Sequence, residues 1–137
     1  MGWLYSILVV GLLLGVWAVL RDNKRFRNFD NGSCVGREWR RRFPDIPKTE
    51  IRQFLDIFVD AFFINRDSRL IFPPDKQVMD VYRMLYPPGS MVDGLELETF
   101  AMDLEDRYGV DVNSLQRQDI TLGDIFEYVV SHRRSQN

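Results

Sequence analysis

Residues that support disulfide bonds, metal binding or catalysis are scarce in this sequence. Cys34 is the single cysteine among 137 residues, so the chain can form no internal disulfide and no zinc cluster, which suits a reducing compartment. The single histidine, His132, lies in a polar C-terminal stretch, and the sequence contains no glycine-rich phosphate loop and no metal-ligand spacing. Paired carboxylates on an acidic helix are typical of surface charge rather than of an acid and base pair. We therefore expect no enzymatic activity.

Charge is also missing from residues 2–20, GWLYSILVVGLLLGVWAVL. As a helix this stretch would be roughly 28 Å long, close to the roughly 30 Å of a bilayer's hydrocarbon core. No basic region precedes it and no small-x-small cleavage site follows it, which indicates an uncleaved transmembrane anchor in the lipid bilayer. Basic residues follow the stretch directly. The positive-inside rule then predicts a single-pass membrane protein with a cytoplasmic C-terminal domain, as in the bacterial inner membrane.

Two glycines, Gly11 and Gly15, lie four residues apart inside this apolar stretch. The spacing places two small residues on one helix face, which lets a second membrane helix approach closely. The sequence thus allows a weak homodimer through the anchor, packed at these two glycines. Glycine is common in membrane helices, so the alternative that both are permissive filler stays open.

Residues 21–46 are basic and contain the loop-like run NFDNGSCVG, which predicts a juxtamembrane linker. Residues 21–52 hold ten Lys or Arg and five acids, a net charge of +5, whereas residues 53–137 hold eight against fifteen, a net charge of −7. A basic linker of this kind would lie along anionic lipid headgroups. The cluster WRRRF at 39–43 is also typical of nucleic-acid binding, but the acidic domain that follows argues against a nucleic-acid partner. Acylation of Cys34 and an inert free thiol both stay open.

Residues 47–132 show the apolar periodicity of helices. No segment sustains a period of two, so we predict an all-α domain without a sheet, followed by a polar tail over residues 133–137. A core of this size should fold without a metal or a disulfide. The predicted core residues are Phe54, Leu55, Phe58, Phe62, Tyr82, Leu97, Phe100, Leu104, Tyr108, Ile120, Ile125, Phe126 and Val129.

Punctuating residues set the boundaries of these helices. Asp75 is expected to cap the second helix, and the hydroxyl of Thr121 is expected to accept a hydrogen bond from the backbone N–H of Asp124 at the start of the last one. Gly109 is expected to end the third helix. The expected helices run from Pro47 to residues 65–68, from 78 to 85, from about Asp93 to Gly109, over a short turn at 113–118, and from about 122 onward.

The run VDGLELETFAMDLEDRYGVDVNSLQRQDITLGDIFEYVVSH, residues 92–132, resembles the second half of an acyl carrier protein. In that family a helix opening with Asp-Ser-Leu carries acidic residues and a hydrophobic-x-x-Leu-Glu-x-x-aromatic run, then a short helix and a capped last helix. The resemblance implies a four-helix bundle, and a looser likeness extends back to Pro47. The matching residues are Asp93, Leu95, Met102, Leu104, Glu105, Tyr108, Val110 to Val112, Ile120 to Leu122, Ile125, Tyr128 and Val129.

The position that matters most in this resemblance is Gly94. The family attaches 4'-phosphopantetheine through a phosphodiester to the serine of Asp-Ser-Leu, and Gly94 stands where that serine would be. Glycine has no side-chain oxygen, so we expect no cofactor at this degenerate attachment position. The alternative is that Ser90, in the loop PPGSMVDG, carries the arm in a shifted register and that the protein is an active carrier delivering acyl groups to a membrane enzyme. The ordinary role for Ser90 is that of a loop or capping residue.

Without an attachment serine, the resemblance still implies a protein-recognition surface. In carrier proteins the acidic second helix docks onto basic patches of partner enzymes. Residues 93–127 hold ten acids against two arginines, a net charge of −8. We therefore predict a non-catalytic docking or regulatory adaptor at the cytoplasmic face, whose partner is a basic protein, for example a membrane-associated or acyl-transfer enzyme. A merely solvated helix face is the alternative. The predicted partner-binding residues are Asp93, Leu95, Glu98, Met102 and Asp106.

Overall fold

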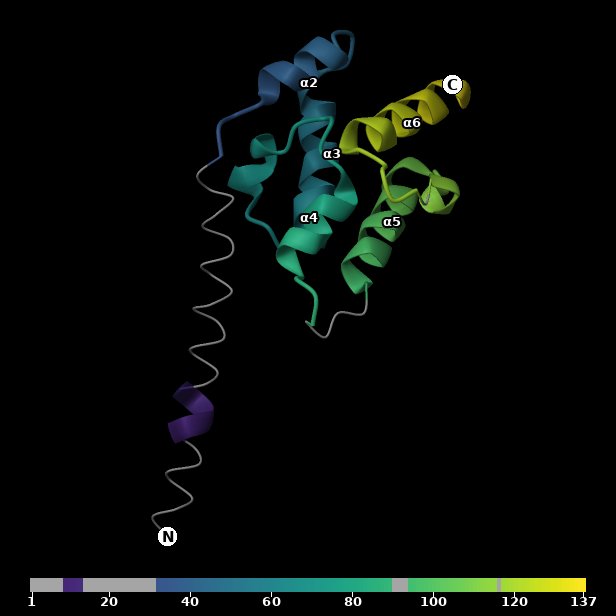
Figure 1. The fold of residues 1–137 in the computed structure, drawn as a ribbon. Helices are drawn as coiled ribbons and strands as arrows, with labels where there is room; N and C mark the ends of the chain where they lie inside the picture. Colours follow the sequence, from purple (N-terminus) through teal and green to yellow (C-terminus); the bar gives the residue numbers. More distant parts are fainter. Residues whose placement is uncertain (1–8, 14–31, 90–93, 116) are drawn as a thin grey trace. The chain divides into compact units, whose positions relative to one another are not determined.

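The computed structural model describes residues 9–13, 32–89, 94–115 and 117–137 of the chain (Figure 1). The chain divides into two compact units, an N-terminal unit from Met1 to Gly32 and a C-terminal unit from Ser33 to Asn137. The regular secondary structure in the described ranges is helical, and the described residues form no strand, so the all-α prediction is confirmed. Gln77 and Thr121 form an isolated antiparallel bridge.

The N-terminal unit corrects the prediction of a single-pass membrane protein. Across the described residues, every helix falls short of the length and apolar character that a membrane crossing needs. Residues 9–13 are helical and exposed, and the rest of the predicted anchor, including Gly15, lies outside the described residues. Gly11 lies within them, and a Cβ placed on it would have no heavy atom within 4 Å.

The C-terminal unit consists of five α-helices and two short 3-10 helices within its described residues. Helix α3 lies at the centre of the unit in Figure 1 and packs against both η1 and α5. The elements in chain order are α2 (Gly36–Arg42), α3 (Lys48–Ala61), η1 (Arg66–Ile71), α4 (Val78–Leu85), α5 (Leu95–Tyr108), η2 (Val112–Leu115) and α6 (Leu122–Ser135).

An aromatic cluster forms the core around α3. The Phe54 ring centroid lies 5.0 Å from that of Phe126 on α6, and the Phe58 ring lies 5.4 Å from Phe100 on α5 and 5.3 Å from Phe72. Each buried phenylalanine contributes roughly 1.5–3 kcal/mol by removing apolar surface from water. Most of the predicted core is buried, whereas Tyr82, Leu97 and Tyr108 are half-buried.

Helix α2 lies where the sequence predicts a linker. Its Trp39 has no exposed surface, stacks on Phe43 at 5.9 Å and meets the edge of Phe126 at 5.7 Å. The indole Nε1–H donates a 2.8 Å hydrogen bond to the buried carbonyl of Phe72. Ile46 is buried as well. Residues 33–46 therefore belong to the C-terminal unit, because these apolar side chains fix the basic segment to the core.

The polar residues at 65–68, predicted only to end the preceding helix, belong to the 3-10 helix η1 and its N-cap. Helix α3 ends at Ala61, earlier than predicted, because Phe63 adopts a left-handed backbone with φ 55°. The Ile64 N–H donates to the carbonyl of Val59 at 2.8 Å, and the Phe63 N–H donates to that of Asp60 at 3.1 Å. These two bonds form the Schellman motif that ends many helices, in which glycine is the usual left-handed residue. Because Phe63 is 73% exposed, burial of its side chain offsets little of the energy cost of its left-handed backbone.

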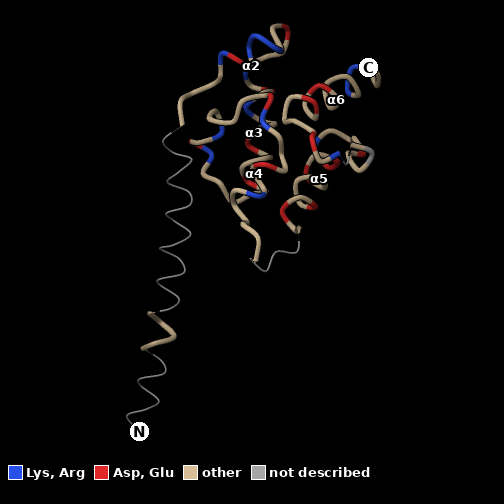
Figure 2. Tube along the Cα trace, in the orientation of Figure 1, with Lys and Arg blue, Asp and Glu red and all other residues tan. Residues whose placement is uncertain are grey.

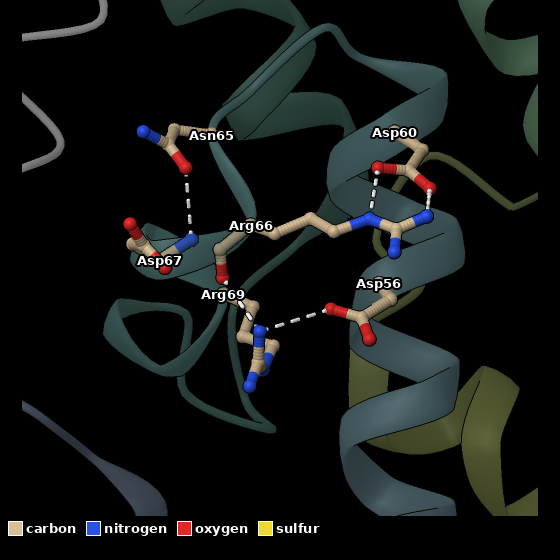
Figure 3. Close-up of polar contacts among 6 residues, drawn as sticks. All are labelled: Asp56, Asp60, Asn65, Arg66, Asp67 and Arg69. Atoms are coloured by element: carbon tan, nitrogen blue, oxygen red, sulfur yellow. Dashed lines mark hydrogen bonds and ion pairs between the residues drawn. The ribbon is translucent and has the colours of Figure 1, made fainter.

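Ion pairs hold η1 against α3, as Figure 3 shows. The Arg66 guanidinium donates to both carboxylate oxygens of Asp60, at 2.9 and 2.6 Å, and Arg69 pairs with Asp56 at 3.3 Å. Hydrogen bonding from Arg66 to Asp60 and their charge attraction raise the pKa of the Arg66 guanidinium above its ordinary value. The Asn65 side chain caps η1 by accepting from the Asp67 N–H at 3.0 Å. The segment is thus ordered by side chains of α3 rather than by its own periodicity.

The start of α6 has the predicted cap. The Thr121 hydroxyl accepts from the Asp124 N–H at 3.1 Å, and the Asp124 carboxylate accepts from the Thr121 N–H at 3.2 Å, which is a complete capping box. Helix α4, in contrast, is capped at Gln77 and not at Asp75. The Gly123 N–H donates to the Pro74 carbonyl at 2.7 Å, which places the start of α6 directly beside the chain entering α4.

Candidate docking site on helix α5

Two glycines define the length of α5. Gly94 is its N-cap with φ 74°, and Gly109 is its C-cap with φ 66° and donates its N–H to the Glu105 carbonyl at 2.7 Å. Both residues are left-handed, a conformation that costs a residue with a Cβ roughly 1–2 kcal/mol. The helix therefore begins at Leu95, and Gly109 ends it as the sequence predicts.

Gly94 differs from an attachment serine in two ways: it lacks a side-chain oxygen, and its backbone is left-handed. No heavy atom lies within 4 Å of a Cβ placed on Gly94, so a serine there would meet open space but a strained backbone. A standard N-cap serine accepts a bond from the helix on an extended backbone, whereas Gly94 makes no side-chain cap at all. Ser90 and Asp93, the other two residues singled out at this end of the helix, lie outside the described residues.

Four predicted partner-binding residues lie exposed along α5. Leu95 is 56% exposed and Met102 63% exposed, and the exposed acids Glu98 and Asp106 alternate with them at helical spacing. On the opposite side of the helix, Phe100 and Leu104 are buried. We refer to Leu95, Glu98, Met102 and Asp106 together as the α5 docking surface.

The acids of α5 are not neutralised within the unit. Figure 2 shows acidic residues along the helix. Glu96 accepts a 2.7 Å hydrogen bond from the hydroxyl of Tyr86. No described Lys or Arg forms an ion pair with the acids of this helix, and its one arginine, Arg107, donates instead to Gln53 at 3.3 Å. The exposed carboxylates of Glu98, Glu105 and Asp106 are therefore available to an external cation, whereas one oxygen of Glu96 is bonded to Tyr86 and the other is buried. The acids of α5 are Glu96, Glu98, Asp103, Glu105 and Asp106.

An apolar cavity of about 490 Å³ opens beside this surface. It lies between α5, the start of α4, η2 and the residues leading into α6, with Gly94 and Glu98 on its border. Its volume would accept an aromatic or a long aliphatic side chain of a partner. The polar residues Glu98, Asn113, Arg117 and Gln118 also line it. The apolar lining residues are Val78, Met79, Leu97, Phe100, Ala101, Leu104, Val112, Leu115, Ile120 and Ile125.

The shifted pKa values of Tyr108 and Asp124 follow from burial and hydrogen bonding. Burial raises the pKa of the Tyr108 phenol, whose hydroxyl has no hydrogen-bond partner in the described part of the chain. Burial also acts to raise the pKa of the Asp124 carboxyl, but hydrogen bonds from Thr121 and Arg42 outweigh it and leave that pKa below its usual range. Within the four described ranges, no three His, Cys, Asp or Glu side chains are arranged to hold a metal ion.

Helix α2 carries a further charged surface that the sequence did not predict. The sequence assigns its arginines to a linker, whereas Arg37 and Arg41 lie exposed on an ordered helix, four residues apart, and form no ion pair with a described residue. A signal was present, because Trp39, Phe43 and Ile46 have the i, i+4, i+7 spacing of a buried helix stripe.

Comparisons of the chain with protein-family models, with curated proteins and with solved structures each found no match. The resemblance to acyl carrier proteins therefore stays a prediction made from the sequence.

Proposed function

We propose that the C-terminal unit is a non-catalytic protein-docking domain that binds a basic, partly apolar partner through the α5 docking surface. One observation supports this function above the others. Leu95 and Met102 are more than half exposed on a helix whose acids have no cation partner among the described residues. Leu95 and Met102 lie seven residues apart on one face of α5, so with Glu98 and Asp106 they form a small apolar and acidic surface that a basic, partly apolar partner would cover.

The energies favour a weak and selective contact. Complete burial of a Leu or Met contributes roughly 1.5–3 kcal/mol, so covering the exposed parts of Leu95 and Met102 contributes about 2–4 kcal/mol before the cost of association. The carboxylates add specificity and speed of encounter more than affinity. Since a Kd of 1 µM corresponds to about −8 kcal/mol, we expect a micromolar or weaker complex.

We further propose that α3, α5, η2 and α6 form a four-helix bundle of the carrier type that has lost its attachment serine. The order of a long helix ended by Gly109, a short helix at η2 and a last helix capped at Thr121 supports this arrangement. Gly94 supports the loss, because it supplies no oxygen for a phosphodiester. Helices α2 and α4 and the 3-10 helix η1 are additions to that plan. The domain would thus keep the docking helix of a carrier and not its cargo.

Co-purification with matched charge variants tests the docking function. Glu98→Lys with Asp106→Lys reverses the α5 docking surface, and Asp75→Lys with Asp119→Lys makes the same change of charge at exposed acids elsewhere. A partner that is retained by the wild-type chain and by the control but lost from the α5 variant supports the proposal. Identical sets of bound proteins on all three chains would refute it.

A further inference from the structure

We propose that the basic partner of the α5 docking surface is helix α2 of a second copy of this chain, giving a head-to-tail assembly. This inference rests on the proposed function and names its partner. Helix α2 is an ordered basic helix where the sequence predicts a linker, and its exposed arginines supply the positive charge that the α5 docking surface requires.

Helix α2 presents its arginines on a rigid support. Trp39 has no exposed surface and is held by its hydrogen bond to the Phe72 carbonyl, so the backbone that carries the neighbouring arginines is fixed to the core. Arg40 and Arg42 are used inside the unit, because Arg40 donates to the Ile46 carbonyl at 2.8 Å and Arg42 pairs with Asp124 at 2.9 Å. Arg37 and Arg41 have no such partner among the described residues. Arginine is enriched at protein interfaces, and its planar guanidinium can donate two hydrogen bonds to one carboxylate.

The two surfaces carry charges of opposite sign. Arg37 and Arg41 supply positive charge on α2, and Glu98 and Asp106 supply negative charge on α5 with Met102 between them. Along their helix axes, Arg37 and Arg41 are about 6 Å apart and Glu98 and Asp106 about 12 Å apart, so the two pairs of charges agree in sign but not in spacing. Figure 2 shows the basic residues gathered on α2 and the acidic ones along α5. Among the described residues, neither surface pairs with the other within one unit, so both are available to a second copy.

The geometry of this contact is heterologous, because it joins two different surfaces. Each copy that uses its α5 surface leaves its α2 surface free, so the assembly grows as an open chain or closes into a ring. The attraction is between exposed charges and is screened over about 8–10 Å at physiological salt. We therefore expect association that strengthens as salt is lowered.

Sedimentation of the whole chain at about 0.05 M and about 0.5 M salt tests the inference. The wild-type chain should show larger species at low salt that dissociate at high salt. The basic variant Arg37→Glu with Arg41→Glu and the acidic variant Glu98→Lys with Asp106→Lys should each lose this salt-dependent association. The control Asp75→Lys with Asp119→Lys should keep it, and circular dichroism verifies that every variant is folded.

Two complementation results distinguish a specific contact from general charge effects. An equimolar mixture of the basic and acidic variants should associate again, because each contributes one intact surface. A chain carrying all four reversals should also associate with itself, since both signs are exchanged. A wild-type chain of unchanged size at both salts, or a fourfold variant that behaves like the single-surface variants, would overturn the inference. The proposed function would survive that result if co-purification still finds a different partner that depends on Glu98 and Asp106.

Discussion

Replacing Trp39 with alanine tests whether the basic segment before Pro47 is part of the folded unit. The indole is completely buried, contacts the rings of Phe43, Phe54 and Phe126 at 5.7 to 6.1 Å, and donates to the Phe72 carbonyl. Truncating a buried Trp to Ala costs about 3–5 kcal/mol through lost burial and the cavity left behind. Removing the indole donor from the buried Phe72 carbonyl costs about 1–3 kcal/mol more.

The sum is comparable with the whole stability of a domain of this size, which is of the order of 5–15 kcal/mol. We therefore expect Trp39→Ala to lower the free energy of unfolding by at least about 3 kcal/mol or to leave the unit unfolded, as measured by urea titration followed by circular dichroism. Arg41→Ala on the same helix is the matched control and should change stability by less than about 0.5 kcal/mol, because its side chain is exposed. A loss below about 1 kcal/mol for Trp39→Ala would show that the segment is the linker that its composition suggests.

Three further substitutions probe single features of the structure. Gly94→Ser should lower stability by about 1 kcal/mol in the same titration, because the cap bond it could form only partly offsets a left-handed backbone; a stabilised variant would contradict that backbone. Phe63→Gly should raise stability by about 0.5–1 kcal/mol, whereas Phe63→Ala, which keeps the strain, should not. The lowered pKa of Asp124 contributes stability that is present above about pH 4 and lost as pH falls through the folded pKa. Asp124→Asn should therefore lose less stability than the wild-type chain between about pH 6 and pH 3, and equal losses would remove Asp124 from the account.

Local signals predicted the helices that carry the site. Helix α5 is bounded by Gly94 and Gly109 and α6 by the Thr121 cap, and each signal acts through a backbone or side-chain bond within a few residues. The exposure of Leu95 and Met102 likewise follows from the helical period once Phe100 and Leu104 point inward.

Other features depend on contacts between residues far apart in the sequence. Trp39 contacts Phe72 and Phe126, which lie far from it in the sequence. Three apolar residues among arginines do not predict such a distant contact. The cavity beside α5 depends on where η2 settles against it. The membrane-spanning helix predicted from the charge-free run at residues 2–20 and its basic flank was wrong, because the described residues contain no helix long and apolar enough to cross a bilayer.

Photo-crosslinking from α5 tests the central claim most directly. A photoreactive phenylalanine analogue at Met102 is compared with the same analogue at Met84, an α4 residue of similar exposure, 56% against 63%. We expect Met102 to crosslink to one discrete protein, a second copy of this chain or another basic partner, and Glu98→Lys with Asp106→Lys to abolish the product. Crosslinks of equal yield from both positions, or none from Met102, would contradict a docking surface on α5.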